Sequence, residues 1–330
     1  MVKPWQRGRG PLAFICMAVV GLCLLSYWLP QPRAAAPYSR IVLMADAHLP
    51  VRTEVVQDVA KQLRVKAAKE KALQDINAWE DVAQVAVLGD ITAERGTVEE
   101  YAYAVRYFDA LKKTLFPMVG NHDYMYADTL SEKGKRLRAD ARERQEKLER
   151  FKAAFHLPEV YYSKQEAGYL LLFLSPDSLD GKYLTELSPR QLAWAQQQLE
   201  AKPQLPTIVF FHAPLAGTLA PYNKEANTPN FIAQPEAALA ELIQRYPQIF
   251  LWVSGHTHTP ATNASFAAPV NVYAGQVTNI HNADMDRETI WTNSLYLYPD
   301  RVVVKTFDHK RGAWLEQLER TIYPMQISER

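Results

Sequence analysis

The sequence predicts an α/β protein whose domain is built in layers, with strands buried against helices. Five short apolar runs carry this prediction: 41–45, 85–88, 117–119, 207–211 and 249–253. Each run is nearly continuous in apolar residues, which is typical of a strand buried on both faces. Stretches of helical composition alternate with these runs, and such alternation favours a layered α/β domain.

The helices and the remaining strands follow from spacing and capping signals. Helices are expected over 53–80, 98–113, 188–201 and 235–246. Ser188 and Pro189 form an N-cap and a first-turn proline for the third of these. Further strands are expected at 169–174, 270–275, 294–298 and 302–307. The last two flank Pro299 and Asp300 as a hairpin, so the sheet should be mixed, and 41–330 should form one domain.

Residues 131–154 form a dense run of charges of both signs. A mobile cap over a site, or a basic helix facing a membrane, is one interpretation. We favour a solvated helix stabilised by pairs four residues apart, such as Glu143 with Lys147. Mixed signs give little attraction to anionic lipid, which is the reason for this preference.

The N-terminus predicts a membrane anchor. Residues 1–10 carry three positive charges and 11–29 carry none. A helix of that length approaches the roughly 30 Å thickness of the hydrocarbon core. The positive flank predicts that 1–10 is cytoplasmic and that 41–330, joined by a linker at 30–40, lies outside the cytoplasm, in the periplasm if the cell is bacterial. Cleavage after Ala36, giving a secreted protein, is the alternative, although Pro37 should hinder a peptidase.

Composition and charge exclude several classes of protein. Hydrophobic residues make up 48% and charged residues 22%, as in ordinary globular chains. Residues 1–40 hold five basic and no acidic residues, so the 32 basic and 36 acidic residues that follow give 41–330 a net charge of −4. This acidic body lacks the electrostatic footprint of a nucleic-acid-binding protein. Cys16 and Cys23 both lie in the N-terminal apolar run, so the body has no thiolate metal site.

Asp, Asn and His residues follow the five apolar runs. The candidate ligands are Asp46, His48, Asp90, Asn121, His212, His256 and His258. In open α/β sheets ligands bind outside the carboxyl ends of the strands, so these side chains can converge although they lie far apart in sequence. Oxygen and imidazole donors suit divalent Mn, Fe, Co or Zn rather than Ca.

Seven ligands exceed the needs of one tetrahedral ion and suit two ions that share a carboxylate. Residues two apart on an extended backbone share a face. The side chains of Asp46 and His48, and those of His256 and His258, should therefore point to the same side. Glycines beside the ligands permit sharp turns there: Gly89, Gly120 and Gly255.

In chain order the motifs are DAH at 46–48, GD at 89–90, GNHD at 120–123, FH at 211–212 and GHTH at 255–258. Together they resemble the signature of the calcineurin-like metallophosphoesterase superfamily from about 41 to 275. The resemblance implies a four-layer α/β/β/α sandwich of two mixed sheets flanked by helices, with two metal ions at the strand ends. It implies that Asp46, His48 and His258 hold one ion, that Asn121, His212 and His256 hold the other, and that Asp90 bridges them.

The resemblance also implies a mechanism. A metal-bridging hydroxide attacks phosphorus directly, His122 contacts the phosphate and protonates the leaving oxygen, and Asp123 orients His122. Ala93 stands where purple acid phosphatases carry a Tyr, which disfavours a purple, redox-fixed centre. The segment 89–95 misses the Arg register of protein phosphatases, so protein dephosphorylation is disfavoured as well.

The expected function is a membrane-anchored, extracytoplasmic phosphohydrolase acting on a small phosphomonoester or phosphodiester. Lipid headgroups and cell-envelope phosphates are candidate substrates, because the short linker keeps the domain near the bilayer. A nuclease of the same family and a non-catalytic scaffold are the alternatives; the acidic body and the complete ligand set disfavour them. Four residues just beyond the ligands are expected to pack in loops more readily than to touch substrate: Tyr124, Tyr222, Asn223 and His281.

Overall fold

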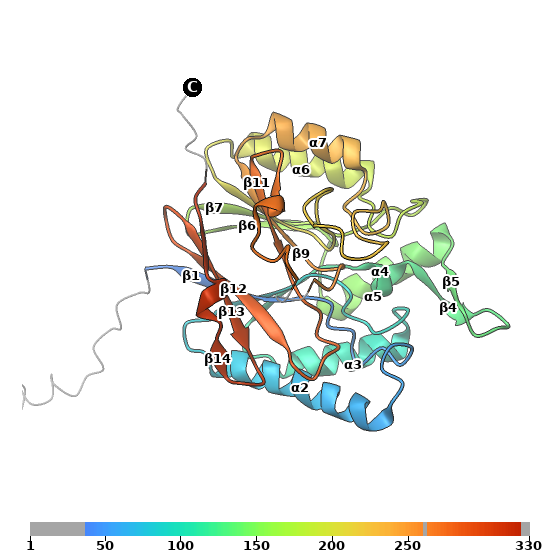
Figure 1. Cartoon of the computed structure of the whole chain (residues 1–330). Coiled ribbons are helices and arrows are strands. Elements are labelled where there is room, and N and C mark those ends of the chain that lie inside the picture. Colours follow the sequence, from blue (N-terminus) through green and yellow to red (C-terminus); the bar gives the residue numbers. More distant parts are fainter. Residues whose placement is uncertain (1–36, 260–262, 325–330) are drawn as a thin grey trace, which may run out of the picture. The chain divides into compact units, whose positions relative to one another are not determined.

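The computed structural model describes residues 37–259 and 263–324. In this part of the chain two sheets lie face to face and carry helices on their outer sides (Figure 1). The predicted anchor at 11–29 lies outside the described residues, as does most of the predicted linker. Among the residues that are described, none forms a helix long and apolar enough to cross a membrane.

The first sheet has seven strands in the order β14-β13-β12-β1-β2-β3, with β15 also paired to β13. Their bounds are β1 Ser39–Met44, β2 Gln84–Val87, β3 Thr114–Pro117, β12 Trp291–Leu297, β13 Val302–Asp308, β14 Ala313–Trp314 and β15 Arg320–Ile322. β1, β2 and β3 run parallel, whereas β12 lies antiparallel to both β1 and β13. β12 and β13 are the predicted hairpin, and the Tyr298 N–H donates to the Arg301 carbonyl in its turn.

The second sheet has six strands in the order β10-β11-β9-β8-β7-β6. Their bounds are β6 Tyr162–Glu166, β7 Tyr169–Phe173, β8 Thr207–Phe210, β9 Ile249–Ser254, β10 Val272–Tyr273 and β11 Val277–His281. β7, β8, β9 and β11 run parallel, and the edge strands β6 and β10 run antiparallel. Mixed sheets are thus confirmed. The strand predicted at 270–275 is confirmed only at β10, because Pro269–Asn271 forms a 3-10 turn, and β11 follows as a second strand.

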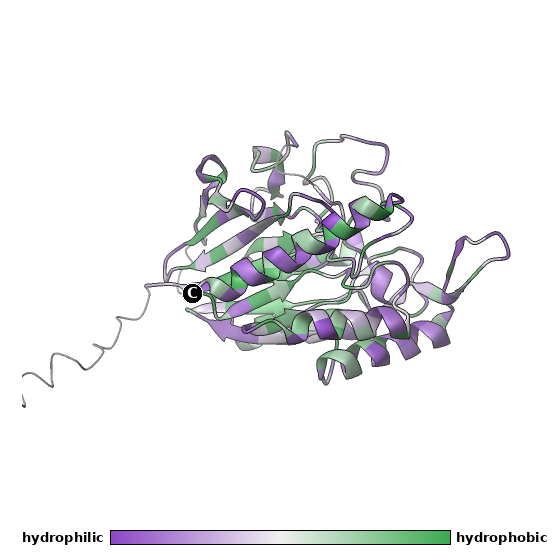
Figure 2. Cartoon of the chain, turned by 90° about the horizontal axis from the view of Figure 1, so that it is seen from below, coloured by the Kyte–Doolittle hydropathy of each residue, from purple (hydrophilic) through white to green (hydrophobic). Residues whose placement is uncertain are grey.

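Strand β1 shows why the apolar runs are continuous. Ile41 and Leu43 belong to the core between the two sheets, whereas Val42 and Met44 belong to the core under the helices. All four side chains are at most 1% exposed. Successive residues of a strand point to opposite faces, so a strand covered on both faces needs apolar residues at every position. Figure 2 shows the inner strands mostly green between helices with purple outer surfaces.

The described helices, apart from short 3-10 turns, are α2 Val59–Ala78, α3 Val98–Asp109, α4 Asn121–Tyr124, α5 Ala141–Phe155, α6 Pro189–Ala201 and α7 Glu236–Arg245. α2 and α3 lie on the side of the first sheet, and α6 and α7 on the side of the second (Figure 1). α6 has the predicted cap, since the Ser188 side chain accepts from the Gln191 N–H. α2 starts later than predicted because Asp58 caps it through the Lys61 N–H.

The charged run at 131–154 matches its prediction only in part, since α5 has a pair four residues apart between Arg142 and Glu146. It contains β5 (Arg136–Arg138), which pairs with β4 (Tyr126–Leu130), and most of α5. One face of α5 is buried through Leu148 and Phe151. Glu143 and Lys147 do not pair with each other; the Glu143 carboxylate accepts from the Asp128 N–H, and Lys147 forms an ion pair with the Asp128 carboxylate. α5 therefore packs against the core through its apolar residues, which a count of its charges does not reveal.

Candidate metal centre

The residues predicted as ligands lie beyond the carboxyl ends of five strands. Asp46 and His48 follow β1, Asp90 follows β2, Asn121 opens α4 after β3, His212 follows β8, and His256 and His258 follow β9. All are buried except His258, whose side chain is 22% exposed. Parallel strands bring their carboxyl ends to one edge, which is why residues so distant in sequence meet.

The first group of possible ligands contains Asp46, His48, Asp90 and His258. Their ligand atoms lie within 4.8 Å of one another. The Nε2 atoms of His48 and His258 are 3.3 Å apart, and Nε2 of His258 is 3.2 Å from Oδ1 of Asp46. The two imidazoles and two carboxylates therefore face one common point.

The second group contains Asp90, His212 and His256, again with ligand atoms within 4.8 Å of one another. Nε2 of His212 lies 3.3 Å from Oδ1 of Asp90 and 3.1 Å from Oδ1 of Asn121. Asp90 belongs to both groups, which is the arrangement that a bridging carboxylate requires. The structure thus brings all seven predicted ligands to one place.

Five of the seven candidate ligands have a left-handed backbone conformation. The φ angles are 48° at Asp46, 43° at His48, 49° at Asp90, 65° at His256 and 50° at His258. Such a conformation is uncommon for residues other than glycine and costs on the order of 1 kcal/mol each. Strain of this kind gathers at functional sites.

The same angles correct the expectation of an extended backbone in the two short motifs. Asp46 and His48 do reach the same group, but by a left-handed turn. His256 and His258 also have left-handed backbone, and each belongs to a different group. One Gly-His-Thr-His motif therefore contributes to both halves of the centre.

Glycines make room for the carboxylates. A Cβ atom on Gly120 would collide with the backbone N and Oδ1 of Asp90, and one on Gly255 would collide with Oδ2 of Asp46. Gly89 combines a φ of 84° with contact to the His212 ring. The predicted turns are present, and close approach of ligand side chains is a second reason for glycine at these positions.

Hydrogen bonds determine which ring nitrogen each histidine can offer to a metal. Nδ1 of His212 lies 2.7 Å from the Leu88 carbonyl, to which it donates, and this leaves Nε2 for a cation. Nε2 of His256 lies 2.8 Å from the Asn230 carbonyl, which leaves Nδ1. Carbonyl partners of this kind fix the tautomer and orientation of metal-binding imidazoles.

The donor set fits a divalent metal. Two ligand atoms that each lie about 2.1 Å from one ion are about 3.0–3.4 Å apart. His48 Nε2 and His258 Nε2 are 3.3 Å apart, a separation that suits a hydrogen bond between the rings as well as a cation shared by them. The thiolate-free set matches the metals expected from the sequence.

Burial and the charge of Asp90 determine which of the ligand histidines carry a proton. Burial lowers the pKa of His256 to about 3 and holds the pKa of His48 well below its usual range. Burial also acts to lower the pKa of His212, but the Asp90 carboxylate outweighs it and raises the pKa to about 9. A divalent cation between Asp90 and His212 would take the place of that proton, because a metal-bound imidazole must be neutral.

His122 lies beside the metal groups and is fixed on two sides. Its backbone N–H donates to Oδ1 of Asp90 at 2.8 Å, and its Nδ1 lies 2.9 Å from the Glu94 carbonyl. Nη1 of Arg136 lies 3.3 Å from both ring nitrogens. Burial lowers the pKa of His122 to about 4; Arg136 adds to this shift and Asp90 opposes it.

Asp123 does not have the role predicted for it. Its carboxylate accepts from the backbone N–H groups of Ile91, Thr92 and Gly120 at 2.8 to 3.2 Å, and it does not bond to the His122 ring. The Glu94 carbonyl holds Nδ1 of His122 instead. Asp123 therefore ties together the turns that carry Asp90 and Asn121, because a buried carboxylate is satisfied by the nearest backbone donors.

Sequence reasoning did not find the residues that surround this centre. Arg136 sits over the Tyr126 ring at 4.7 Å and pairs with Glu54 at 3.2 Å. Arg52 pairs with Asp286 and lies 3.4 Å from Nδ1 of His258. These residues stand on connecting segments and a short hairpin, where no motif marks them. The charge run at 131–154 was the only signal, and it did not single out Arg136.

A cleft of about 540 Å³ opens above the centre. Its lining includes Asp90, Asn121, His122, His256 and His258. Arg52, Arg136 and Arg287 also line it, as do Tyr222 and Asn223, for which loop packing was the favoured expectation. Of the other two weaker candidates, Tyr124 is fully buried and His281 bonds to the Thr218 carbonyl.

The structure thus has two facing sheets and, at their strand ends, two groups of possible metal ligands that share Asp90. This arrangement is typical of a metal-dependent phosphoesterase. The chain belongs to the calcineurin-like phosphoesterase family, whose sequence model matches residues 39–260. It is a hydrolase that acts on phosphoric ester bonds. No curated protein matches this sequence.

Solved structures share the fold. A dimetal phosphatase from Danio rerio is 15% identical, and the match covers 88% of this chain and 100% of that one with a TM-score of 0.55. A purple acid phosphatase from yellow lupin (Lupinus luteus) seeds is 14% identical, and the match covers 89% of this chain and 55% of that one with a TM-score of 0.57. At these identities the likeness establishes the fold alone.

Proposed function

We propose that this chain is a metal-dependent phosphohydrolase anchored in a membrane, with its domain outside the cytoplasm. The observation that carries the catalytic part is the pair of ligand groups that share Asp90. Two divalent cations, when bound there, supply the charge that activates water for attack on phosphorus and that neutralises phosphate oxygens. Asp46, His48 and His258 would hold one cation, Asn121, His212 and His256 the other, and Asp90 both.

His122 is the proposed general acid. Because the Glu94 carbonyl holds Nδ1, Nε2, which lies 3.3 Å from Nη1 of Arg136, is the atom that would meet a substrate in the cleft. A phosphate anion beside the ring favours the protonated form, which counters the effect of burial. Nε2 then contacts a phosphate oxygen and gives its proton to the leaving oxygen.

The cleft and the N-terminus support the proposed class of substrate and the location. About 540 Å³ accommodates a small phosphate ester. The three basic residues of 1–10 and the uncharged stretch 11–29 support an anchor that keeps 1–10 in the cytoplasm. Lipid headgroups and cell-envelope phosphates are the substrates that a tethered domain meets most often. Carbonate extraction of membranes checks the anchor, since an anchored chain stays with the membrane and a cleaved chain is released.

The first test uses the full chain in mild detergent, loaded with Mn²⁺. Metal-dependent release of nitrophenol from p-nitrophenyl esters of phosphate is expected, and Asp90→Asn should abolish it. Asp109→Asn, which makes the same change at an exposed position, is the matched control. Wild-type protein that takes up no metal after loading would contradict the proposal and favour a non-catalytic scaffold.

Direct attack by water is tested separately by the stereochemical course at phosphorus, with a substrate made chiral there by oxygen isotopes. Net inversion is expected, because a single in-line displacement inverts the configuration. Net retention would instead mean that a side chain of the enzyme attacks first and that water then releases the phosphate.

A further inference from the structure

Two cavities meet at the candidate metal centre. The cleft of about 540 Å³ holds His122 and Arg136, and a second cavity of about 670 Å³ lies beside it. Three residues line both: Arg52, His258 and Arg287. His258 is a candidate ligand, so the second cavity adjoins the first at the edge of the candidate metal centre. His122 lines the first cavity, and Trp291 lines the second.

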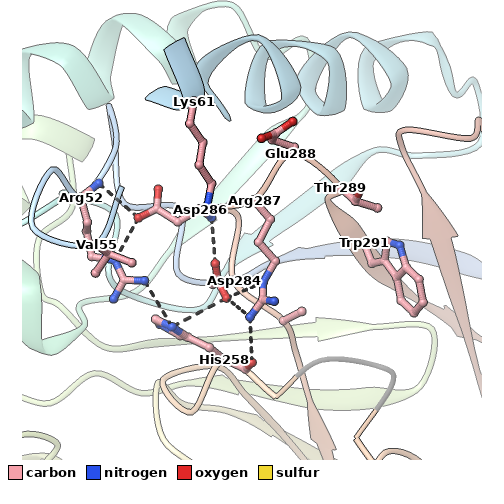
Figure 3. Close-up of a pocket in the computed structure, with 11 residues that line it drawn as sticks. Arg52, Val55, Lys61, His258, Asp284, Asp286, Arg287, Glu288, Thr289 and Trp291 are labelled. Carbon is pink, nitrogen blue, oxygen red and sulfur yellow. Dashed lines mark hydrogen bonds and ion pairs between the residues drawn. The ribbon is translucent and has the colours of Figure 1, made fainter. Parts of the chain in front are cut away.

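The second cavity lies between the start of α2 and the segment that joins β11 to β12. Figure 3 shows Arg52 and Val55 on one side, Trp291 on the opposite side and His258 at the bottom. Trp291 is the first residue of β12, and Val55 and Ala283 are the other apolar residues that line the cavity. An indole ring in such a wall offers a flat apolar surface for an organic group.

The arginines of the second cavity are paired with carboxylates of the protein. Arg52 bonds to Asp286 at 2.9 Å and Arg287 bonds to Asp284 at 2.6 Å. Glu288 pairs with Arg64 at 3.1 Å, and Lys61 also lines the cavity. The three basic and three acidic side chains of the lining balance, so the cavity offers no net charge to a further phosphate. This balance favours an uncharged group.

We propose that the substrate is a phosphodiester whose non-leaving arm occupies the second cavity against Trp291. The inference rests on the proposed function and assigns its class of substrate. The leaving arm lies in the first cavity, where His122 can protonate its oxygen. Water forms the new bond to phosphorus, the bond to the leaving oxygen breaks, and that oxygen takes the proton. The product is a monoester that keeps the second arm. A monoester substrate would leave the second cavity without an occupant.

The test varies the second arm alone. Three substrates release the same nitrophenol: p-nitrophenyl phosphate, methyl p-nitrophenyl phosphate and phenyl p-nitrophenyl phosphate. With the Mn²⁺-loaded full chain, kcat/KM should be highest for the phenyl diester, about tenfold above the methyl diester. Trp291→Ala should reduce this phenyl-to-methyl ratio about tenfold, and Trp291→Phe should reduce it less, because a phenyl ring still stacks.

Trp194→Ala is the matched control. Trp194 is a partly buried tryptophan of α6 that lines neither cavity, so its removal should leave the phenyl-to-methyl ratio within twofold of wild type. A binding measurement adds a second readout. Diphenylphosphinate, which has no ester bond to cleave, should bind wild type about tenfold tighter than methylphenylphosphinate in calorimetry, and about equally to Trp291→Ala.

The outcomes separate the two levels of the proposal. Turnover of the monoester without turnover of either diester would overturn the diester assignment and leave the phosphohydrolase function intact. An unchanged phenyl-to-methyl ratio in folded Trp291→Ala would overturn the assignment of the second cavity. Failure of the metal-loaded wild type to cleave all three esters would overturn the proposed function itself, and the inference with it.

Discussion

The centre of the site and its rim are built from different parts of the chain. The seven candidate ligands stand directly beyond strand ends in short motifs, and five of them have left-handed backbone. The rim residues Arg52, Arg136 and Arg287 stand on connecting segments and a short hairpin, held by ion pairs. The reacting centre therefore depends on the rigid ends of the strands. Selection of substrate depends on the connecting segments, whose position is set by their packing against the rest of the protein.

The largest effect should come from the carboxylate common to both ligand groups. Asp90→Asn should lose both equivalents of metal and reduce kcat at least about 1,000-fold, because neither ion keeps its bridging ligand. Asp46→Asn should lose one equivalent, since Asp46 belongs to one group. Metal content by atomic absorption measures this. If the two variants bound the same number of metal ions per chain, the description of two ligand groups that share Asp90 would be wrong.

The second largest effect should be on the free energy of unfolding, and two glycines test it. Gly120 lies at the centre, and Gly134 lies in the turn between β4 and β5 at the rim. Gly120→Ala should destabilise the fold by about 3 kcal/mol and impair metal uptake, because its Cβ would displace Asp90. Gly134→Ala meets no atom within 4 Å and should cost about 1 kcal/mol, through its φ of 70°. Urea unfolding measures both. If Gly134→Ala proved the costlier change, the centre would not be the more tightly built region.

The rim should affect binding more than chemistry. Arg136→Ala should raise KM about tenfold with a smaller effect on kcat, because its guanidinium lies at the cleft wall beside His122. Since the charge of Arg136 lowers the pKa of His122, its removal should also move the His122 limb of the pH profile to higher pH. Arg142→Ala, whose side chain is 87% exposed, is the control. A decrease in kcat without a change in KM would mean that Arg136 acts in the chemical step rather than in substrate binding.

The smallest effect concerns a histidine outside both regions. Burial lowers the pKa of His281 to about 3. The unfolded chain takes up this proton near pH 6.5, so the contribution to stability is complete above pH 6.5 and is lost as the pH falls from there toward 3. His281→Gln should weaken this acid dependence in denaturant titrations, and His156→Gln, at an exposed position, should not. An identical pH dependence in wild type and His281→Gln would contradict the prediction.

The sequence predicted the elements that depend on local patterns. β1, β8 and β9 match their predicted runs to within two residues, because a strand covered on both faces leaves a continuous apolar signal. Ser188 and Pro189 begin α6 where predicted, since a cap acts within four residues. The β4–β5 hairpin was not predicted, because its short polar strands carry neither alternation nor an apolar run.

The sequence by itself determined the alternation of strands and helices, the donor chemistry and the residues that supply it, because each depends on residue type and spacing along the chain. The tertiary structure decided what surrounds those residues. It holds Nδ1 of His122 at the Glu94 carbonyl rather than at Asp123, and it forms the second cavity beside Trp291. These outcomes depend on left-handed turns and on contacts between residues distant in sequence, and no local pattern specifies them.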